Sequence, residues 1–110
     1  RLQRRWAQDD VVLYRQGDTL CVGRVAAVGG DVVLLDESGE LRVNGTLHTG
    51  EIPYATYPAE GLTYPYTVPE GCLFLLCDYR TQGQDSRHFG AVPEDSVAGK
   101  VITLLRRRGL

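Results

Sequence analysis

Apolar residues in this chain are gathered into short runs that are separated by glycine and polar residues. Valine, leucine, isoleucine, tyrosine and threonine dominate these runs, which is typical of β-strands. No stretch keeps an apolar period of 3.6 residues for three helical turns. The pattern predicts a mostly β domain. The predicted strands are Val11–Arg15, Thr19–Val28, Asp31–Asp36, Leu41–Val43, Cys72–Asp78 and Lys100–Leu105.

The gaps between these strands hold residues that tolerate positive φ, as tight turns require. The predicted turns are Gln16–Asp18, Gly29-Gly30, Glu37–Gly39 and Asn44-Gly45. Sequential hairpins imply antiparallel sheets or a partly open barrel. The best helical candidate is a single turn at Pro93–Val97, with proline and acidic residues at its start. We therefore expect little or no helix.

The segment from Glu51 to Tyr66 differs from the rest because tyrosine and proline alternate along it. Its prolines exclude it from a central strand position. Two interpretations stay open. The segment either packs over one face of the sheet or offers aromatic side chains to a partner, since tyrosine is enriched at interfaces.

Length and charge narrow the possible functions. The chain has 110 residues, which fits one domain spanning 1–110. A net charge of −2 argues against nucleic-acid binding, which normally needs a basic face. The longest apolar run, Leu73–Leu76 between two cysteines, is far shorter than the ~20 residues that cross a bilayer.

Three cysteines leave at least one thiol unpaired. Cys72 and Cys77, five residues apart on one extended segment, are expected to project to opposite faces. A Cys21–Cys77 disulfide across neighbouring strands is conceivable, although buried free thiols are the simpler expectation. No Cys-x-x-Cys pair accompanies His48 or His88, so we expect no metal site, and nothing in the sequence suggests a cofactor.

The segment Cys77–Arg87 carries the most informative motif, because it resembles the Gly-Asp-Asn-Arg-x-x-Ser-x-Asp-Ser-Arg box of type I signal peptidases. Five other segments resemble further parts of that family in the same order and spacing. They are Asp10–Leu13, Val22–Asp31, Leu41–Gly45, Val68–Gly71 and Val92–Lys100. The six segments are spread along the chain and leave out chiefly the Tyr/Pro-rich stretch.

The resemblance implies an extracytoplasmic, mostly β peptidase domain at the cell membrane, tethered by an N-terminal membrane helix that would precede Arg1. The nucleophilic serine of the family lies in a Ser-Met-x-Pro context that would also fall upstream. Ser38, Ser86 and Ser96 all lack that context.

Two positions depart from the family in a way that bears on chemistry. The family activates its serine with a buried lysine of depressed pKa, and that position is Gly23 here. The serine that orients the lysine corresponds to Gly83. Lys100 is the single lysine of the chain and falls where the family uses the residue for structure. The resemblance therefore implies a site without its catalytic base.

Other charged residues of the box match the family. Arg24, Asp85 and Arg87 correspond to an ion-pair cluster that joins two segments, with Asp78, Arg80 and Ser86 in the same box; the alternative is that they are solvated surface charges. Cys77 replaces a glycine beside the lysine. We expect its thiol to fill the volume of the missing lysine stem, so that Cys77→Gly would lower stability by about 1 kcal/mol.

The resemblance is strongest to a signal-peptidase-like accessory protein of Gram-positive pilus operons, in which glycine also replaces the lysine. It implies a protein that binds extended polypeptide without cleaving it and assists pilus assembly, with pilin subunits and a pilus sortase as partners. Two alternatives remain open: an active signal peptidase whose base comes from elsewhere, and a structural domain that binds no peptide.

Overall fold

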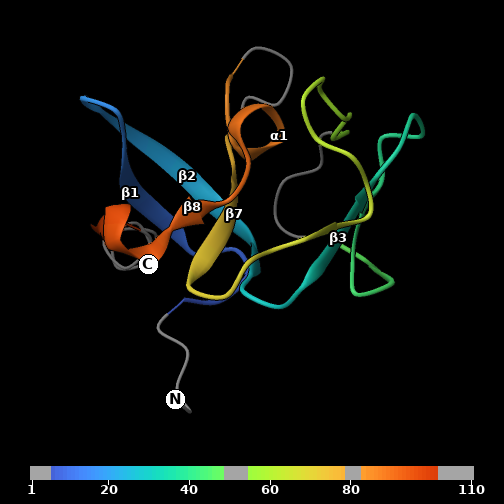
Figure 1. Ribbon diagram of the computed structural model, residues 1–110, viewed down its shortest axis with the longest axis horizontal. Helices are drawn as coiled ribbons and strands as arrows, with labels where there is room; N and C mark the ends of the chain where they lie inside the picture. Colours follow the sequence, from blue (N-terminus) through green and yellow to red (C-terminus); the bar gives the residue numbers. More distant parts are fainter. Residues whose placement is uncertain (1–5, 49–54, 79–82, 102–110) are drawn as a thin grey trace, which may run out of the picture.

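The computed structural model describes residues 6–48, 55–78 and 83–101, and in them the chain is mostly β, as predicted (Figure 1). The first sheet has the strand order β8-β7-β2-β1-β9, and the second has the order β5-β4-β3-β6. The first sheet consists of β1 (Val11–Gln16), β2 (Thr19–Val28), β7 (Cys72–Leu76), β8 (Val92–Pro93) and β9 (Val97–Lys100). The second consists of β3 (Val32–Leu35), β4 (Leu41–Val43), β5 (Thr46–Leu47) and β6 (Tyr66–Thr67).

Every pair of neighbouring strands is antiparallel, as the hairpin pattern predicts. Asn44 and Gly45 have φ values of 54° and 85°, which confirms the predicted two-residue turn between β4 and β5. The Asn44 side chain also accepts a hydrogen bond from Val32 N–H at 2.9 Å. The turn is thereby fixed to the start of β3.

Three sequence predictions need correction. The strand predicted at Cys72–Asp78 ends at Leu76, and the one predicted at Asp31–Asp36 covers Val32–Leu35. Strand β9, the last strand within the described residues, covers Val97–Lys100 and so begins earlier than the predicted Lys100–Leu105, because pairing with β1 overrides the weak β-propensity of Ala98 and Gly99. Residues 102–105 of the predicted strand lie outside the described residues.

Helical structure in the described ranges is confined to two short elements. A 3-10 turn, Glu94–Ser96, lies where one helical turn was predicted. The helix α1 (Ser86–Phe89) was not predicted. Its N-cap residue Asp85 accepts a hydrogen bond from Arg87 N–H, and the His88 ring accepts one from Asp85 N–H, so a reciprocal cap supports a single turn.

The two faces of the first sheet each cover a hydrophobic cluster. Phe74 and Leu76 of β7 pack with Val33, Leu35 and neighbouring residues of the second sheet. Leu73 and Leu75 point the other way, into a cluster with Trp6, Val12, Tyr14, Val25 and Val92. Because successive side chains of a strand face opposite sides, β7 must be apolar throughout, which explains its uninterrupted hydrophobic run.

The described part of the Tyr/Pro-rich stretch packs largely as a loop. Tyr64 and Tyr66 lie against the cluster between the sheets, and the Tyr66 and Phe74 ring centroids are 5.5 Å apart. Tyr66 and Thr67 form the edge strand β6, consistent with prolines excluding this stretch from the sheet interior. Tyr57 is 48% exposed, and Tyr54 lies outside the described residues.

Candidate functional site

Gly23, the position that the resemblance gives to the lysine, lies buried in the middle of β2 opposite Val12 of β1. A Cβ atom placed on Gly23 would lie 2.9 Å from Tyr14 Cε1 and 3.2 Å from Leu75 Cβ. Both separations are closer than ordinary van der Waals contact. The space that a side chain at position 23 would enter is therefore already occupied.

Tyr14 borders this space, and the expectation that the Cys77 thiol fills the volume of a lysine stem stays a prediction. The three atoms nearest to the added Cβ belong to Tyr14 and Leu75. Strand β1 brings the ring there because Tyr14 follows Val12 at a spacing of two and so shares its face. The sequence alone predicts that Val12 and Tyr14 share a face, but it does not predict the register in which β1 pairs with β2.

The Tyr14 hydroxyl is held in its neutral form. Burial raises the pKa of Tyr14 to about 12, and the nearby Cys21, Asp85 and Cys77 groups raise it further in the same direction. The ring is only 2% exposed. A phenol with so high a pKa cannot act as a general base near neutral pH, because its conjugate base is almost absent.

This shift predicts how stability responds to alkali. The native pKa of Tyr14 is above the ordinary value of 10. The stability that the buried, neutral phenol contributes is therefore fully present below pH 10 and is lost as pH rises toward 12. Denaturant unfolding between pH 8 and 11.5 should therefore show a steeper loss of stability in the parent protein than in Tyr14→Phe. Equal pH slopes would contradict the prediction. Tyr57→Phe, at an exposed ring, is the matched control.

All three cysteines carry free thiols, and Cys77 is half-buried. Cys77 N–H donates a hydrogen bond to Asp85 Oδ2 at 2.9 Å, which joins the end of β7 to the cap of α1. Because Cys21 and Cys77 are both free, the conceivable disulfide between them is not formed in this structure.

Asp85 and Arg87 form a buried ion pair with side-chain exposures of only 1% and 5%. Arg87 donates from Nε to Asp85 Oδ1 and from Nη2 to Oδ2, both at 2.9 Å, which is the bidentate geometry that arginine favours. Burial alone would raise the pKa of Asp85, but the hydrogen bonds from Arg87 and Cys77 lower it overall. Arg87 also donates to the Tyr57 carbonyl at 3.2 Å.

Ser86 is fully buried, and its hydroxyl accepts a hydrogen bond from Leu75 N–H at 2.9 Å. Asp85 and Ser86 of the box therefore both accept hydrogen bonds from backbone N–H groups of β7 or of Cys77, which follows it. Through its hydrogen bond, Ser86 holds α1 against β7. The box is a structural clamp in the described residues.

Arg24 pairs with Asp78 through two hydrogen bonds of 2.9 and 3.0 Å. Arg24 is adjacent to Gly23 in β2, so its side chain projects from the opposite face of the sheet. The described residues thus include two ion pairs of the box, Arg24–Asp78 and Asp85–Arg87, and the single cluster that the resemblance implies stays a prediction. Arg80 lies outside the described residues. Gly83, the first described residue after that gap, is half-buried.

Lys100, the single lysine, lies in β9 at the far side of β1 from Gly23. Its Nζ lies 3.1 Å from Asp10 Oδ2 and 6.0 Å from the centre of the Trp6 ring. The amine is therefore bound at the edge of the sheet, which agrees with the structural role predicted for it.

Residues 6–48, 55–78 and 83–101 contain no helix long and apolar enough to span a membrane. In the same ranges, no three His, Cys, Asp or Glu side chains lie close enough together to hold a metal ion.

Comparison with known proteins identifies relatives of the whole fold. A model of the family "Signal peptidase, peptidase S26" matches residues 3–105. The structure is similar to the crystal structure of a signal peptidase I from Enterococcus faecalis V583, with a TM-score of 0.70 and 26% identity, covering 89% of this chain and 97% of that one. The signal-peptidase type of β fold is thereby confirmed.

Curated relatives match shorter stretches. Signal peptidase I of Aquifex aeolicus is 38% identical over 48 residues, which is 44% of this chain and 19% of that protein. Mitochondrial inner membrane protease subunit 1 of Saccharomyces cerevisiae is 30% identical over 79 residues, or 72% of this chain and 37% of that protein. The chain thus spans well under two thirds of these relatives. By the family match over nearly its whole length, the chain belongs to the signal peptidase family, peptidase S26.

Proposed function

We propose that this chain is the polypeptide-binding domain of a signal-peptidase-like protein that does not cleave, and that it assists pilus assembly at the extracytoplasmic face of the cell membrane. The observation that carries the proposal is the ring of Tyr14 beside Gly23. A missing lysine removes the base, and a buried aromatic ring in the adjoining space leaves no room for another residue to supply one from β2.

The rest of the domain retains what binding needs. The two ion pairs and the Ser86 hydrogen bond hold β2, β7 and α1 together without any catalytic group. Proteins bind extended chains by adding a strand to a sheet edge, which requires backbone groups and not a nucleophile. Pilin subunits and a pilus sortase are the proposed partners, and a membrane helix outside this chain is the proposed anchor.

An active signal peptidase is the second candidate, because relatives such as the signal peptidase I of Bacillus caldolyticus, 44% identical over 45 residues, are named for that activity. In that case an upstream Ser-Met-x-Pro motif and a base from outside the described residues would be required. A different residue at the serine position would favour the non-cleaving protein.

The deciding experiment incubates the complete membrane-anchored protein with a secretory precursor that carries a signal peptide. We expect no cleavage, while an active signal peptidase I processes the same precursor in parallel. Stoichiometric or catalytic release of the mature protein would overturn the proposal. In cells, deleting the gene should abolish high-molecular-weight pilus ladders and leave general secretion intact; normal ladders would contradict the role in assembly.

A further inference from the structure

Six arginines lie in the two ends of the chain, three in residues 1–5 and three in residues 102–110. They are half of the 12 basic residues, whereas none of the 14 acidic residues falls in either end. The ends together carry a charge of +6 and residues 6–101 carry −8, which gives the net charge of −2. Positive charge is therefore concentrated at the two ends of an acidic body.

The structure brings the starting points of both ends together. Val101 N–H donates a hydrogen bond to the Val11 carbonyl at 2.7 Å. Lys100 Nζ lies 6.0 Å from the centre of the Trp6 ring. Trp6 is only 6% exposed and belongs to the same hydrophobic cluster as Val12, so the body holds it in place. The first and last described residues thus lie side by side at the start of β1.

Covalent connection keeps both arginine clusters near this place. Arg5 is bonded directly to Trp6, and the other two arginines of that end lie within four further residues. Arg106 is five residues from Val101. An extended chain spans about 3.5 Å per residue, so the two Cα atoms are at most roughly 18 Å apart. All six arginines are therefore tethered to one end of β1.

Apolar residues accompany the second cluster. Arg106–Arg108 follow the run Val101–Leu105, in which Thr103 is the single polar residue. Arginines beside apolar side chains suit the boundary between lipid headgroups and acyl chains, whereas nucleic acid offers phosphates without an apolar layer. The run is far shorter than the ~20 residues that span a bilayer, so it fits a contact with the membrane surface. The cluster also lies beyond residues 3–105, which match the family.

Electrostatics favour an orientation with the arginines against the membrane. Each arginine near an anionic bilayer strengthens binding about fivefold, and the effect decays within about 8 Å at physiological salt. The molecule measures 35 × 31 × 31 Å, so carboxylates on its far side are too distant to repel the membrane strongly. Asp9 and Asp10 lie on the near side, where Lys100 pairs with Asp10 at 3.1 Å. The six arginines outnumber them.

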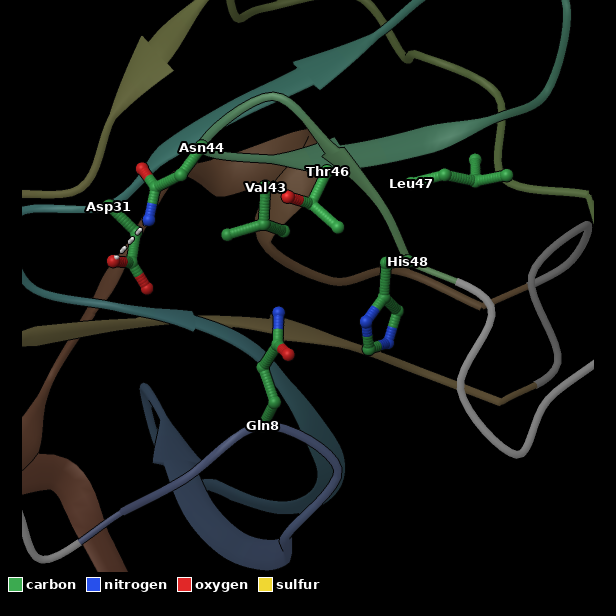
Figure 2. Close-up of a pocket in the computed structure, with 7 residues that line it drawn as sticks. All are labelled: Gln8, Asp31, Val43, Asn44, Thr46, Leu47 and His48. Carbon is green, nitrogen blue, oxygen red and sulfur yellow. Dashed lines mark hydrogen bonds between the residues drawn. The ribbon is translucent and has the colours of Figure 1, made fainter.

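The pocket of about 400 Å³ beside the N-terminal segment is a separate feature (Figure 2). Gln8 points into it from that segment, with Asp31 and His48 at its opposite ends. No lysine or arginine of the described residues lines it. An anionic headgroup would meet the Asp31 carboxylate there, whereas arginine is suited to phosphate. We therefore assign the contact with phosphate to the arginines at the chain ends.

We propose that the two arginine clusters together bind anionic phospholipids, so that the start of β1 and the end of β9 face the membrane. The arginines bind lipid phosphates, and the apolar run before Arg106 enters the headgroup layer. This inference goes beyond the proposed function, because it holds whether or not the protein cleaves a polypeptide. It adds a second attachment to the anchor proposed to precede Arg1.

The first test measures cosedimentation of the full chain with vesicles made of equal parts phosphatidylcholine and phosphatidylglycerol. We expect binding that is absent with pure phosphatidylcholine and that weakens in about 0.5 M salt, where charges are screened. Arg107→Gln/Arg108→Gln and Arg4→Gln/Arg5→Gln should each weaken binding at least about tenfold, because two contributions of about fivefold are lost.

The matched control is Arg15→Gln/Arg42→Gln, the same change of charge on β1 and β4, which should alter binding less than about twofold. A thermal melt checks that each variant folds. Equal binding to both kinds of vesicle, no binding, or an equal loss in the control would overturn the inference. So would displacement by free glycerol phosphate at the total lipid concentration, or tighter binding per phosphate to a DNA duplex.

The second test determines which side of the body faces the lipid. The ¹⁵N-labelled chain is bound to nanodiscs of the same lipids that carry a paramagnetic headgroup label. Amides of Ala7, Asp10 and Lys100 should broaden most, and those of Gly17 and Gly39, in the β1–β2 and β3–β4 turns, much less. Uniform broadening, or stronger broadening at the two turns, would overturn the orientation. Neither test depends on cleavage of a precursor, so a failure here leaves the proposed function standing.

Discussion

Replacing Asp85 with alanine is expected to lower the free energy of unfolding by about 3–5 kcal/mol, the range for removing one partner of a buried ion pair. The mutation leaves the Arg87 guanidinium, which is 5% exposed, without its bidentate acceptor. It also removes the acceptor of Cys77 N–H and the cap of α1. Chemical denaturation monitored by tryptophan fluorescence measures the change.

The matched control is Asp78→Ala, which breaks the other arginine–aspartate pair. Asp78 is 50% exposed, so water screens that pair and its loss should lower stability by less than about 1 kcal/mol. The double variant Asp85→Leu/Arg87→Met should recover most of the loss, because no charge is left buried. Equal effects of Asp85→Ala and Asp78→Ala would show that burial does not set the strength of these pairs.

Acid should remove the contribution of Asp85 as well. Its native pKa is lower than the ordinary aspartate value near 4, so its stabilising effect is present above that pH and is lost as pH falls through the native pKa. The stability difference between the parent protein and Asp85→Leu/Arg87→Met should therefore shift in favour of the double variant below pH 4.

Local sequence patterns predict most of the longer strands of this fold. The features that they do not predict depend on contacts between strands. The β2 strand was predicted with its observed bounds, since a run that contains threonine, leucine and three valines lies between two glycine-containing turns. The earlier start of β9 was missed, because its two small residues carry little propensity and depend on β1 for their structure. The division into two sheets has no sequence signal, because alternation fixes faces but not partners.

The surroundings of Gly23 and the box motif show the same limit at the level of single side chains. Matching the box motif predicted that Asp85, Ser86 and Arg87 hold the fold, and their buried hydrogen bonds agree with that role. It assigned the vacated lysine space to Cys77, the neighbour in the motif. The motif could not predict the Tyr14 ring beside Gly23, because that contact depends on the register of β1 with β2, and register depends on the whole sheet.

Restoring lysine at position 23 is therefore expected to destabilise the protein instead of reviving a site. Gly23→Lys forces a Cβ to within 2.9 Å of Tyr14 and buries an amine, so the free energy of unfolding should fall by about 3 kcal/mol. Tyr14→Ala, which empties a site that is 2% exposed, should cost about 3–5 kcal/mol.

The two substitutions should be strongly non-additive, because the lysine stem would fill the cavity that the ring leaves. The double variant Tyr14→Ala/Gly23→Lys should be more stable than the sum of the single effects predicts by at least about 1 kcal/mol, a coupling typical of residues in direct contact. Tyr64→Ala, at a partly buried tyrosine of the other hydrophobic cluster, combined with Gly23→Lys should give additive losses. Additivity in the first cycle would mean that Tyr14 does not occupy the lysine space, and the structural argument for a non-cleaving protein would fall with it.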